Sequence, residues 1–345
     1  MFNTTEVNRT MPTLSDLGYE ATTAYLIIIG ILGFFANSFV ILVLLKAKIN
    51  FRGIHNKLLL NIAISDLVVS VTAVPLSASS SFAKHWLFSN VGCTIAGFVM
   101  FTCCLNDINT HAAIAIYRFI VICKPQYDYY LKRNTSIRYI LAIIWCHTLL
   151  FTIVPIFGWS RYTPESFGVS CSIAWFDNSA AVLANNIAIV IGCYCIHVII
   201  FTFCYSNIIR TFSKTTSTVA RLREEIITDA HTLKLESMLK YHKILTYRKV
   251  TLASLAMVSA FLIAWSPYAI ICLYFMISEA RPNSTWPYIV PTMFAKSSIV
   301  LSPLSCALFS SSFRKSVKQL FSKSGEDYND MEDGTELQAI APLKS

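Results

Sequence analysis

The sequence predicts an all-α membrane protein, a bundle of seven transmembrane helices followed by a short amphipathic helix. The chain has 345 residues, of which 55% are hydrophobic and only 14% are charged, and its mean hydropathy is +0.56. Its apolar residues fall into seven blocks, each near the roughly 20 residues that a helix needs to cross a hydrocarbon layer of about 30 Å. Such segments cross lipid as helices, because a helix satisfies all of its backbone hydrogen-bonding groups internally.

We expect the spans at residues 22–46, 57–80, 93–117, 137–158, 181–209, 249–277 and 287–310. Residues 1–21 then form an extracellular segment, 22–310 the seven-span domain, 311–323 a membrane-surface helix and 324–345 a disordered acidic tail. In the surface helix, Phe313, Val317 and Leu320 share one face. The third cytoplasmic loop has mixed charges and spaced Leu and Ile residues, which predicts helical extensions of the fifth and sixth spans.

The orientation follows from the basic residues. Most Lys and Arg residues fall in the segments 46–57, 118–138, 206–249 and 311–323, whereas the other side has only Arg9, Lys84, Arg161 and Arg281. The basic side should be cytoplasmic, which places the N-terminus outside a multi-pass protein of the plasma membrane whose first span acts as its own anchor. The net charge of +9 then reflects the orientation of the protein in the membrane. A nucleic-acid partner is excluded, because binding one would need a basic face on a soluble domain, and none is expected.

The outer side also carries candidate sites of covalent modification. Sequons predict glycosylation of Asn3 and Asn8, and a third sequon begins at Asn283. Of the eleven cysteines, nine lie within or beside apolar helices and are expected to be packed thiols. Cys93 and Cys171 alone fall on the outer, oxidising side, so we expect a disulfide between them.

Lys296 lies in the apolar run "PTMFAKSSIV" of the seventh span. A charged lysine near the centre of a span costs at least roughly 2.5–3.5 kcal/mol. Lys296 is about nine residues into its span, or roughly 13 Å deep, which is too deep for the ammonium to reach the membrane surface easily. The structural explanations are an ion pair with Asp66 or Asp107, or a neutral amine. The functional explanation is a desolvated nucleophile that condenses with an aldehyde.

A set of residues spread over the spans resembles the pattern of the rhodopsin-like G-protein-coupled receptors. The resemblance extends over residues 25–321, and its elements are Asn37 in the first span, "LNIAISD" with Asn61 and Asp66 in the second, Trp145 in the fourth, and "AWSPY" with Trp265, Pro267 and Tyr268 in the sixth. The family implies a seven-helix receptor that contacts a heterotrimeric G protein and arrestin on its cytoplasmic side. It also implies an intramembrane polar site that includes Asn37 and Asp66.

Two further segments narrow the resemblance to the opsins. "GWSRYTPESFGVSC" (158–171) is similar to the second outer loop of opsins, which covers the retinal pocket. "FAKSS" (294–298) is similar to their seventh helix, whose lysine forms the retinylidene Schiff base. The chain resembles invertebrate, bistable, retinochrome-like or peropsin-like opsins more than vertebrate visual opsins. The resemblance implies that Lys296 carries covalently bound retinal.

A protonated Schiff base is a buried cation and needs a counterion. Opsins of the vertebrate visual type have a glutamate three residues after the outer cysteine of helix three, where this chain has Ala96. Glu165, six residues before Cys171, matches the other counterion position of the family; its alternative interpretation is an ordinary exposed loop carboxylate. A polyene needs a dry aromatic pocket, and the expected lining residues, which could otherwise be plain helix packing, are Phe98, Tyr162, Trp265 and Tyr268.

The chain departs from the family at its cytoplasmic motifs. The third span reads Tyr117-Arg118-Phe119 where the family has an acid, Arg and Tyr, and Tyr247 replaces a frequent glutamate of helix six. We therefore expect no ion-pair lock on Arg118 and a raised basal activity. In addition, "SPLSC" (302–306) replaces Asn-Pro-x-x-Tyr of helix seven, leaving its proline kink, and His197 replaces a usual proline of helix five.

Asp107 is an intramembrane carboxylate, which is a functional candidate by default. It could join Asp66 in a sodium or proton site, or pair with His111, which lies at i+4 on the same helix. We favour the pairing with His111.

The favoured function is a non-enzymatic, light-sensing receptor that binds retinal and signals through a G protein. The alternatives are a retinal photoisomerase of the retinochrome type and a receptor for a diffusible ligand. The sequence has no catalytic triad, metal-ligand cluster or phosphate-binding loop that would favour another class of protein.

Overall fold

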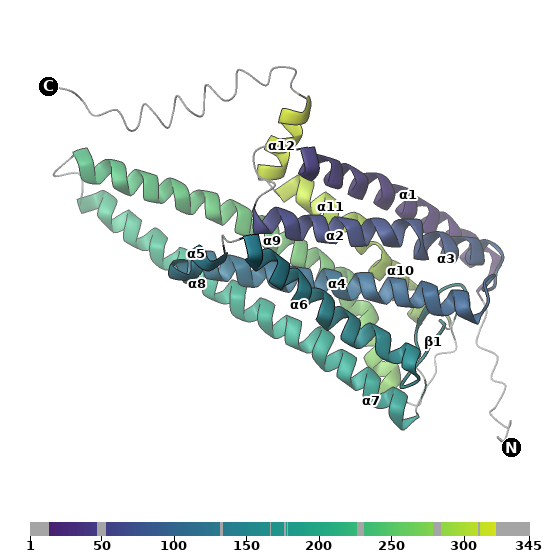
Figure 1. Cartoon of the computed structure of the whole chain (residues 1–345). Coiled ribbons are helices and arrows are strands. Elements are labelled where there is room, and N and C mark those ends of the chain that lie inside the picture. The colour runs from purple at the N-terminus through teal and green to yellow at the C-terminus, as the bar shows by residue number, and fades with distance from the viewer. Residues whose placement is uncertain are drawn as a thin grey trace.

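The computed structural model of the chain describes residues 14–46, 53–131, 134–165, 167–175, 177, 179–225, 231–278, 284–309 and 311–321. Seven helical spans in these residues are long and apolar enough to cross a membrane, namely Asp16–Lys46, Ile54–Phe82, Asn90–Cys123, Thr135–Phe157, Ala180–Thr215, Tyr247–Tyr274 and Trp286–Phe309. They form an elongated bundle, so the predicted fold class is confirmed (Figure 1). The predicted glycosylation sites Asn3 and Asn8, the sequon at Asn283 and the acidic tail lie outside the described residues.

The described residues are mostly helical. In order the helices are α1 (Asp16–Lys46), α2 (Ile54–Val71), α3 (Ala73–Phe82), α4 (Asn90–Cys123), η1 (Pro125–Tyr127), α5 (Asp128–Leu131), α6 (Asn134–Ile153), η2 (Val154–Phe157), α7 (Ala180–Ile189), η3 (Val190–Cys195), α8 (Ile196–Glu225), α9 (His231–Ile277), α10 (Trp286–Lys296), α11 (Ser298–Phe309) and α12 (Ser311–Phe321). Two short strands, β1 (Tyr162–Pro164) and β2 (Cys171–Ile173), pair antiparallel with Tyr162 opposite Ile173.

Several spans are longer or less regular than the sequence predicts. The first begins at Asp16 rather than at residue 22. The second is divided at Thr72, because Pro75 has no backbone N–H and its ring conflicts with the carbonyl four residues earlier. The seventh is divided at Ser297, between α10 and α11, whereas Pro303 lies inside the continuous helix α11. As predicted, the fifth and sixth spans continue beyond the rest of the bundle, to Glu225 and from His231 (Figure 1).

The helix predicted after the seventh span is α12. Its Phe313 is buried and packs edge-on against Phe39 of α1, with the ring centroids 6.4 Å apart. Arg314 is exposed and donates from Nη1 to the carbonyl oxygens of Ala307 and Leu308. These carbonyls belong to the last turn of α11, which has no further helical N–H groups to pair with. The amphipathic pattern therefore packs α12 against the bundle at the end opposite to the hairpin (Figure 1).

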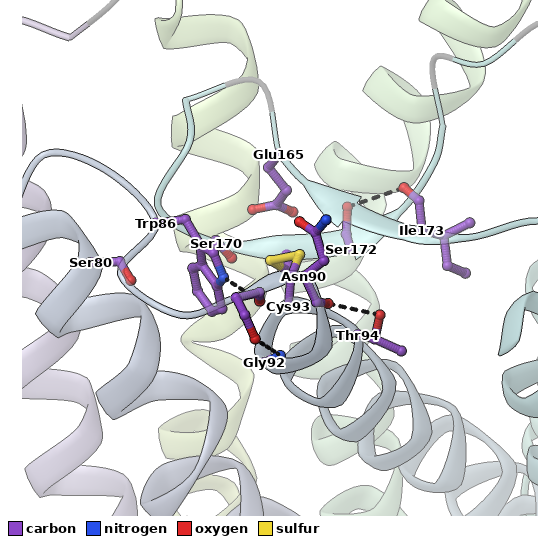
Figure 2. Close-up of a disulfide and its surroundings, with 12 residues drawn as sticks. Ser80, Trp86, Asn90, Gly92, Cys93, Thr94, Glu165, Ser170, Ser172 and Ile173 are labelled. Carbon is purple, nitrogen blue, oxygen red and sulfur yellow. Dashed lines mark hydrogen bonds between the residues drawn. A yellow bond between two sulfur atoms is a disulfide. The ribbon is translucent and has the colours of Figure 1, made fainter.

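The β1–β2 hairpin lies at one end of the bundle and is joined covalently to it. Cys93 in the first turn of α4 and Cys171 of β2 form the predicted disulfide, with a Cα–Cα distance of 5.5 Å. Figure 2 shows the disulfide with Glu165, Ser170 and Ser172 of the hairpin gathered around it. The hairpin is thus held over the space between the helices.

Candidate functional site

A cavity of about 240 Å³ lies inside the bundle, next to the hairpin. Its walls come from α4, η3, α9 and α10 as well as β2, and they are almost entirely apolar. The charged side chains that line the cavity are those of Lys296 and Glu165. A dry cavity with one or two polar groups is the usual form of a site for a largely apolar small molecule.

Lys296 is the last residue of α10 and is only 4% exposed. Its Nζ donates to Ser170 Oγ at 2.9 Å and lies 3.8 Å from Glu165 Oε2. Among the described residues, the carboxylate that faces Lys296 is therefore that of Glu165 in the loop. The alternative explanation for the buried lysine, an ion pair of Lys296 with Asp66 or Asp107, is therefore not supported.

The turn between β1 and β2 brings Glu165 and Ser170 to the same place. The Glu165 N–H donates to the Ser170 carbonyl at 2.7 Å, and the Gly168 N–H donates to the Glu165 carbonyl at 2.8 Å. Gly168 has φ of 73°, in the left-handed region that favours glycine, so this residue permits the tight turn. Sequence reasoning missed Ser170, because a loop serine carries no signal of its own.

The protein provides a hydrogen-bond donor to only one of the two carboxylate oxygens of Glu165. Its Oε1 accepts a long hydrogen bond, 3.4 Å, from the Tyr268 hydroxyl, which in turn accepts one from Trp175 Nε1 at 3.0 Å. Its Oε2 has no hydrogen-bond partner among the described residues. The side chain is 9% exposed, so Glu165 is a buried carboxylate and not an ordinary exposed one. A buried carboxylate with a free oxygen favours a cation beside it.

Of the four predicted lining residues, Trp265 and Tyr268 do face the cavity. Trp265 donates from Nε1 to Ser298 Oγ at 3.1 Å and stacks on Phe261 with centroids 5.9 Å apart. These contacts hold its indole ring at the cavity wall.

Phe98 and Tyr162 lie behind that wall and do not line the cavity. A Cβ atom at Gly97 would lie 2.7 Å from Tyr162 Cδ1, so the absence of a side chain there lets the Tyr162 ring pack directly on α4. The Phe98 ring packs edge-on against it at 6.3 Å, and the Tyr162 hydroxyl donates to the Thr152 carbonyl at 2.8 Å. The two aromatic residues thus hold the hairpin against α4 and α6.

The intramembrane polar residues form a separate cluster. Asn37 donates from Nδ2 to the carbonyls of Gly33 and Ile299, at 2.9 and 2.8 Å. Asp66 of α2 and Asp107 of α4 are both buried and lie close to each other.

The favoured pairing of Asp107 with His111 is wrong. Both ring nitrogens of His111 are buried without a hydrogen-bond partner among the described residues, and its ring packs against Phe261 at 5.4 Å. The carboxyl group of Asp107 lies near that of Asp66 on the facing helix α2 instead. Spacing at i+4 alone therefore did not identify the partner.

At the other end of α4, Arg118 is 7% exposed and its guanidinium lies over the ring of Tyr117, 5.3 Å from the centroid. Tyr205, Tyr247 and His55 are also near this charge. Phe119 packs against Phe203 with the rings 5.3 Å apart. Within the described residues, Arg118 has no carboxylate partner, as the sequence predicts.

The comparisons with known proteins agree with this architecture. The family model described as "7 transmembrane receptor (rhodopsin family)" matches residues 36–305, which is most of the chain. The chain belongs to the rhodopsin family of seven-transmembrane receptors. The prediction from the sequence motifs is thereby confirmed.

Relatives within this family are opsins. The chain is 32% identical to the G0-coupled rhodopsin of Mizuhopecten yessoensis over 296 residues, which cover 85% of this chain and 69% of that protein. It is 26% identical to the visual pigment-like receptor peropsin of Homo sapiens, covering 89% and 86% of the two chains. Its structure is similar to the crystal structure of squid rhodopsin, with a TM-score of 0.82, 25% identity and coverage of 99% and 98%.

Proposed function

We propose that this rhodopsin-family receptor is a light-sensing opsin, which binds retinal covalently at Lys296 and signals through a heterotrimeric G protein. The observation that carries the proposal is the pair of buried groups Lys296 and Glu165, 3.8 Å apart at the edge of an apolar cavity. The G0-coupled rhodopsin among the relatives supports the G-protein partner. The basic cytoplasmic loops support a plasma-membrane protein with its N-terminus outside.

Retinal supplies an aldehyde for attachment and a conjugated chain that absorbs light. The residues of this chain fit such a group in three respects. Lys296 offers the amine, and its burial keeps that amine away from bulk water. Glu165 Oε2 has no hydrogen-bond partner among the described residues and is available to a cation. The apolar walls, including Trp265 and Tyr268, suit a polyene.

The roles of the other residues follow from their contacts. Ser170 accepts a hydrogen bond from Lys296 Nζ and so orients the amine. The hairpin, fixed by the Cys93–Cys171 disulfide, covers the cavity and excludes water from the amine and the carboxylate. Tyr268 donates to Glu165 and keeps the carboxylate turned toward the cavity. Condensation of an amine with an aldehyde releases one water molecule, and a dry site disfavours its reversal.

Arg118 and the adjoining residues supply the candidate contact for the G protein. Arg118 is held by the ring of Tyr117 and not by a carboxylate. A cation–π contact is weaker and less directional than a buried ion pair, so Arg118 is freer to turn toward a partner. This supports the expectation of a raised basal activity, with Tyr117 and Phe119 at the contact.

A retinal photoisomerase is the second candidate, and the similarity to peropsin together with the altered "SPLSC" segment of helix seven favours it. One experiment separates the two. The expressed protein is incubated with single retinal isomers, and three quantities are measured before and after illumination: the absorption spectrum, the isomer bound, and nucleotide exchange on purified G proteins. Light-dependent exchange supports the receptor. Net isomer conversion without exchange supports the photoisomerase. A protein that forms no pigment with any isomer contradicts both.

A further inference from the structure

The fifth span contains an irregular turn beside the candidate site. Between α7 and α8, residues Val190–Cys195 form a π-helical turn, η3, in which the Ile196 N–H donates to the Ile191 carbonyl. Such turns are often found at functional sites, because they widen a helix and redirect its side chains. Here Val190, Cys193 and Tyr194 of η3 line the cavity. The position of η3 therefore sets the shape of one cavity wall.

Two contacts fix η3 against its neighbours. A Cβ atom at Gly192 would lie 2.5 Å from Phe151 Cζ, so the missing side chain lets Phe151 of α6 pack against the backbone of η3. On the other side, the Tyr194 hydroxyl and Ser266 Oγ of α9 are 2.8 Å apart and share a hydrogen bond. These two contacts connect η3 to α6 and to α9.

His197, in the first turn of α8 after η3, makes a further contact between helices. It is 3% exposed, and its Nε2 lies 2.8 Å from Asn109 Oδ1 of α4. Asn109 in turn donates from Nδ2 to Thr148 Oγ1 of α6 at 3.0 Å. Because the amide nitrogen of Asn109 is the donor to Thr148, its oxygen accepts, and His197 must carry its proton on Nε2. One chain of hydrogen bonds thus connects three helices just beyond η3.

His147 offers a matched comparison. Its ring lies 5.8 Å from that of His197 and 5.0 Å from that of Phe151, so it occupies the same region of the bundle. Its Nδ1 is buried without a hydrogen-bond partner among the described residues. His147 therefore packs against this region without belonging to the chain of hydrogen bonds.

We propose that His197 is a positioning residue: through Asn109 and Thr148 it fixes the level and orientation of η3, and thereby sets which retinal isomer the cavity accepts and where the pigment absorbs. A proline at this place would disturb the helix by removing a backbone donor. His197 instead uses a side-chain hydrogen bond to α4, which also fixes the distance between the two helices. The inference rests on the proposed function, since it concerns the fit of retinal in the cavity.

The test uses the full-length protein in lipid nanodiscs, regenerated separately with all-trans, 11-cis and 13-cis retinal. The variants are His197→Phe and Asn109→Leu, which remove the hydrogen bond, and His197→Gln, whose amide N–H can replace that of Nε2. His147→Phe is the control. We expect His197→Phe and Asn109→Leu to shift the absorption maximum in the same direction and to reduce the ratio of regeneration rates between preferred and other isomers by roughly two- to tenfold, the range for one hydrogen bond. The double variant should add little, because both residues act through one contact.

His197→Gln should restore most of the wild-type preference, and His147→Phe should leave both quantities unchanged. If His197→Phe does not fold, Thr148→Val removes the far end of the same chain and should give a smaller shift of the same sign. Lower pigment yield or thermal stability with an unchanged spectrum and unchanged isomer preference would overturn the inference. Failure of the wild-type protein to form pigment would instead contradict the proposed function, so the two failures are distinguishable.

Discussion

Lys296 Nζ and Glu165 Oε2 are 3.8 Å apart, although the two residues come from α10 and from the loop after β1. The distance is longer than a hydrogen bond, and Ser170 Oγ lies closer to the amine at 2.9 Å. Glu165 therefore acts on a charge at Lys296 by Coulomb attraction, and Ser170 provides the direct contact.

The first prediction concerns attachment. Lys296→Ala should form no covalent retinal adduct, because it lacks the buried amine, and borohydride reduction of the wild-type pigment should fix retinal to the peptide that contains Lys296. Lys84→Ala, which changes an exposed lysine on the hairpin side of the bundle, should load normally. Peptide mass spectrometry reports both results. A normal visible pigment from Lys296→Ala would rule out the assignment.

The second prediction concerns the counterion. Glu165→Gln removes the negative charge that stabilises a cation at Lys296, so the protonated Schiff base should be lost at a lower pH than in the wild type. The visible band would then give way to a near-ultraviolet band, and a pH titration of the dark spectrum measures the midpoint. Each unit of displacement corresponds to about 1.4 kcal/mol. Asp107→Asn is the control, and an effect confined to that variant would place the counterion in the membrane cluster.

The third prediction concerns the disulfide. Cys93→Ser and Cys171→Ser should each destabilise the protein by about 2–5 kcal/mol and reduce pigment yield, because the hairpin loses its covalent connection to α4. The double variant should be no worse than either single one, since the same bond is lost. Thermal unfolding in detergent measures the change, with Cys146→Ser, an exposed free thiol, as the control. Two reactive thiols at these positions in the folded wild type would contradict the prediction.

The fourth prediction concerns basal activity. The double change Tyr117→Glu and Tyr247→Glu places carboxylates beside Arg118 and should lower nucleotide exchange in the chromophore-free protein, because an ion pair restrains the guanidinium more strongly than an aromatic ring does. Tyr129→Glu, an exposed change on α5, controls for added negative charge near the cytoplasmic surface. Equal lowering in the control would show that the effect does not depend on Arg118.

The fifth prediction concerns acid stability of the outer loop. The Ser179 N–H donates to Asp177 Oδ1 at 2.8 Å and Arg161 Nη1 lies 2.7 Å from Oδ2; together they hold the pKa of Asp177 below its ordinary value. A lowered pKa means that the carboxylate stabilises the loop above the unfolded-state value of about 3.9. That contribution is lost as the pH falls through the folded-state pKa.

Hydrogen exchange of the Ser179 amide should therefore accelerate below about pH 4, beyond the intrinsic pH dependence of exchange. Asp177→Asn should exchange faster at neutral pH and lose most of the acid-dependent step. An unchanged profile in this variant would mean that another group controls the loop.

The spans and the disulfide were predictable because each depends on one local property. Long apolar runs require helices in lipid, and Cys93 and Cys171 were separated from the other cysteines by their side of the membrane. Lys296 was conspicuous as a lysine deep in an apolar span, but its pairing with Glu165 could be predicted only through the opsin resemblance, because nothing local shows that positions 131 residues apart meet.

The remaining features depend on how helices face one another. Asp107 could reach His111 by spacing, but the rotation of α4 turns its carboxyl group toward Asp66. Phe98 and Tyr162 have the composition of a pocket wall, and the bare backbone of Gly97 decides that they pack behind it. The π-turn of η3 likewise has no sequence signal, since its own contacts are to α6 and α9.

The interruption at Ser297 determines how the seventh span can respond to a force. Lys296 is the terminal residue of α10, and the 12-residue helix α11 starts at Ser298, so the side chain is attached at the joint between two stiff rods and not in the middle of one. A torque applied through the Lys296 side chain would therefore act on the backbone directly beside this joint. Both rods pack against α9, and the inner rod packs more extensively against α1 than the 11-residue outer rod does. We therefore expect the seventh span to bend beside the residue through which it would be pulled.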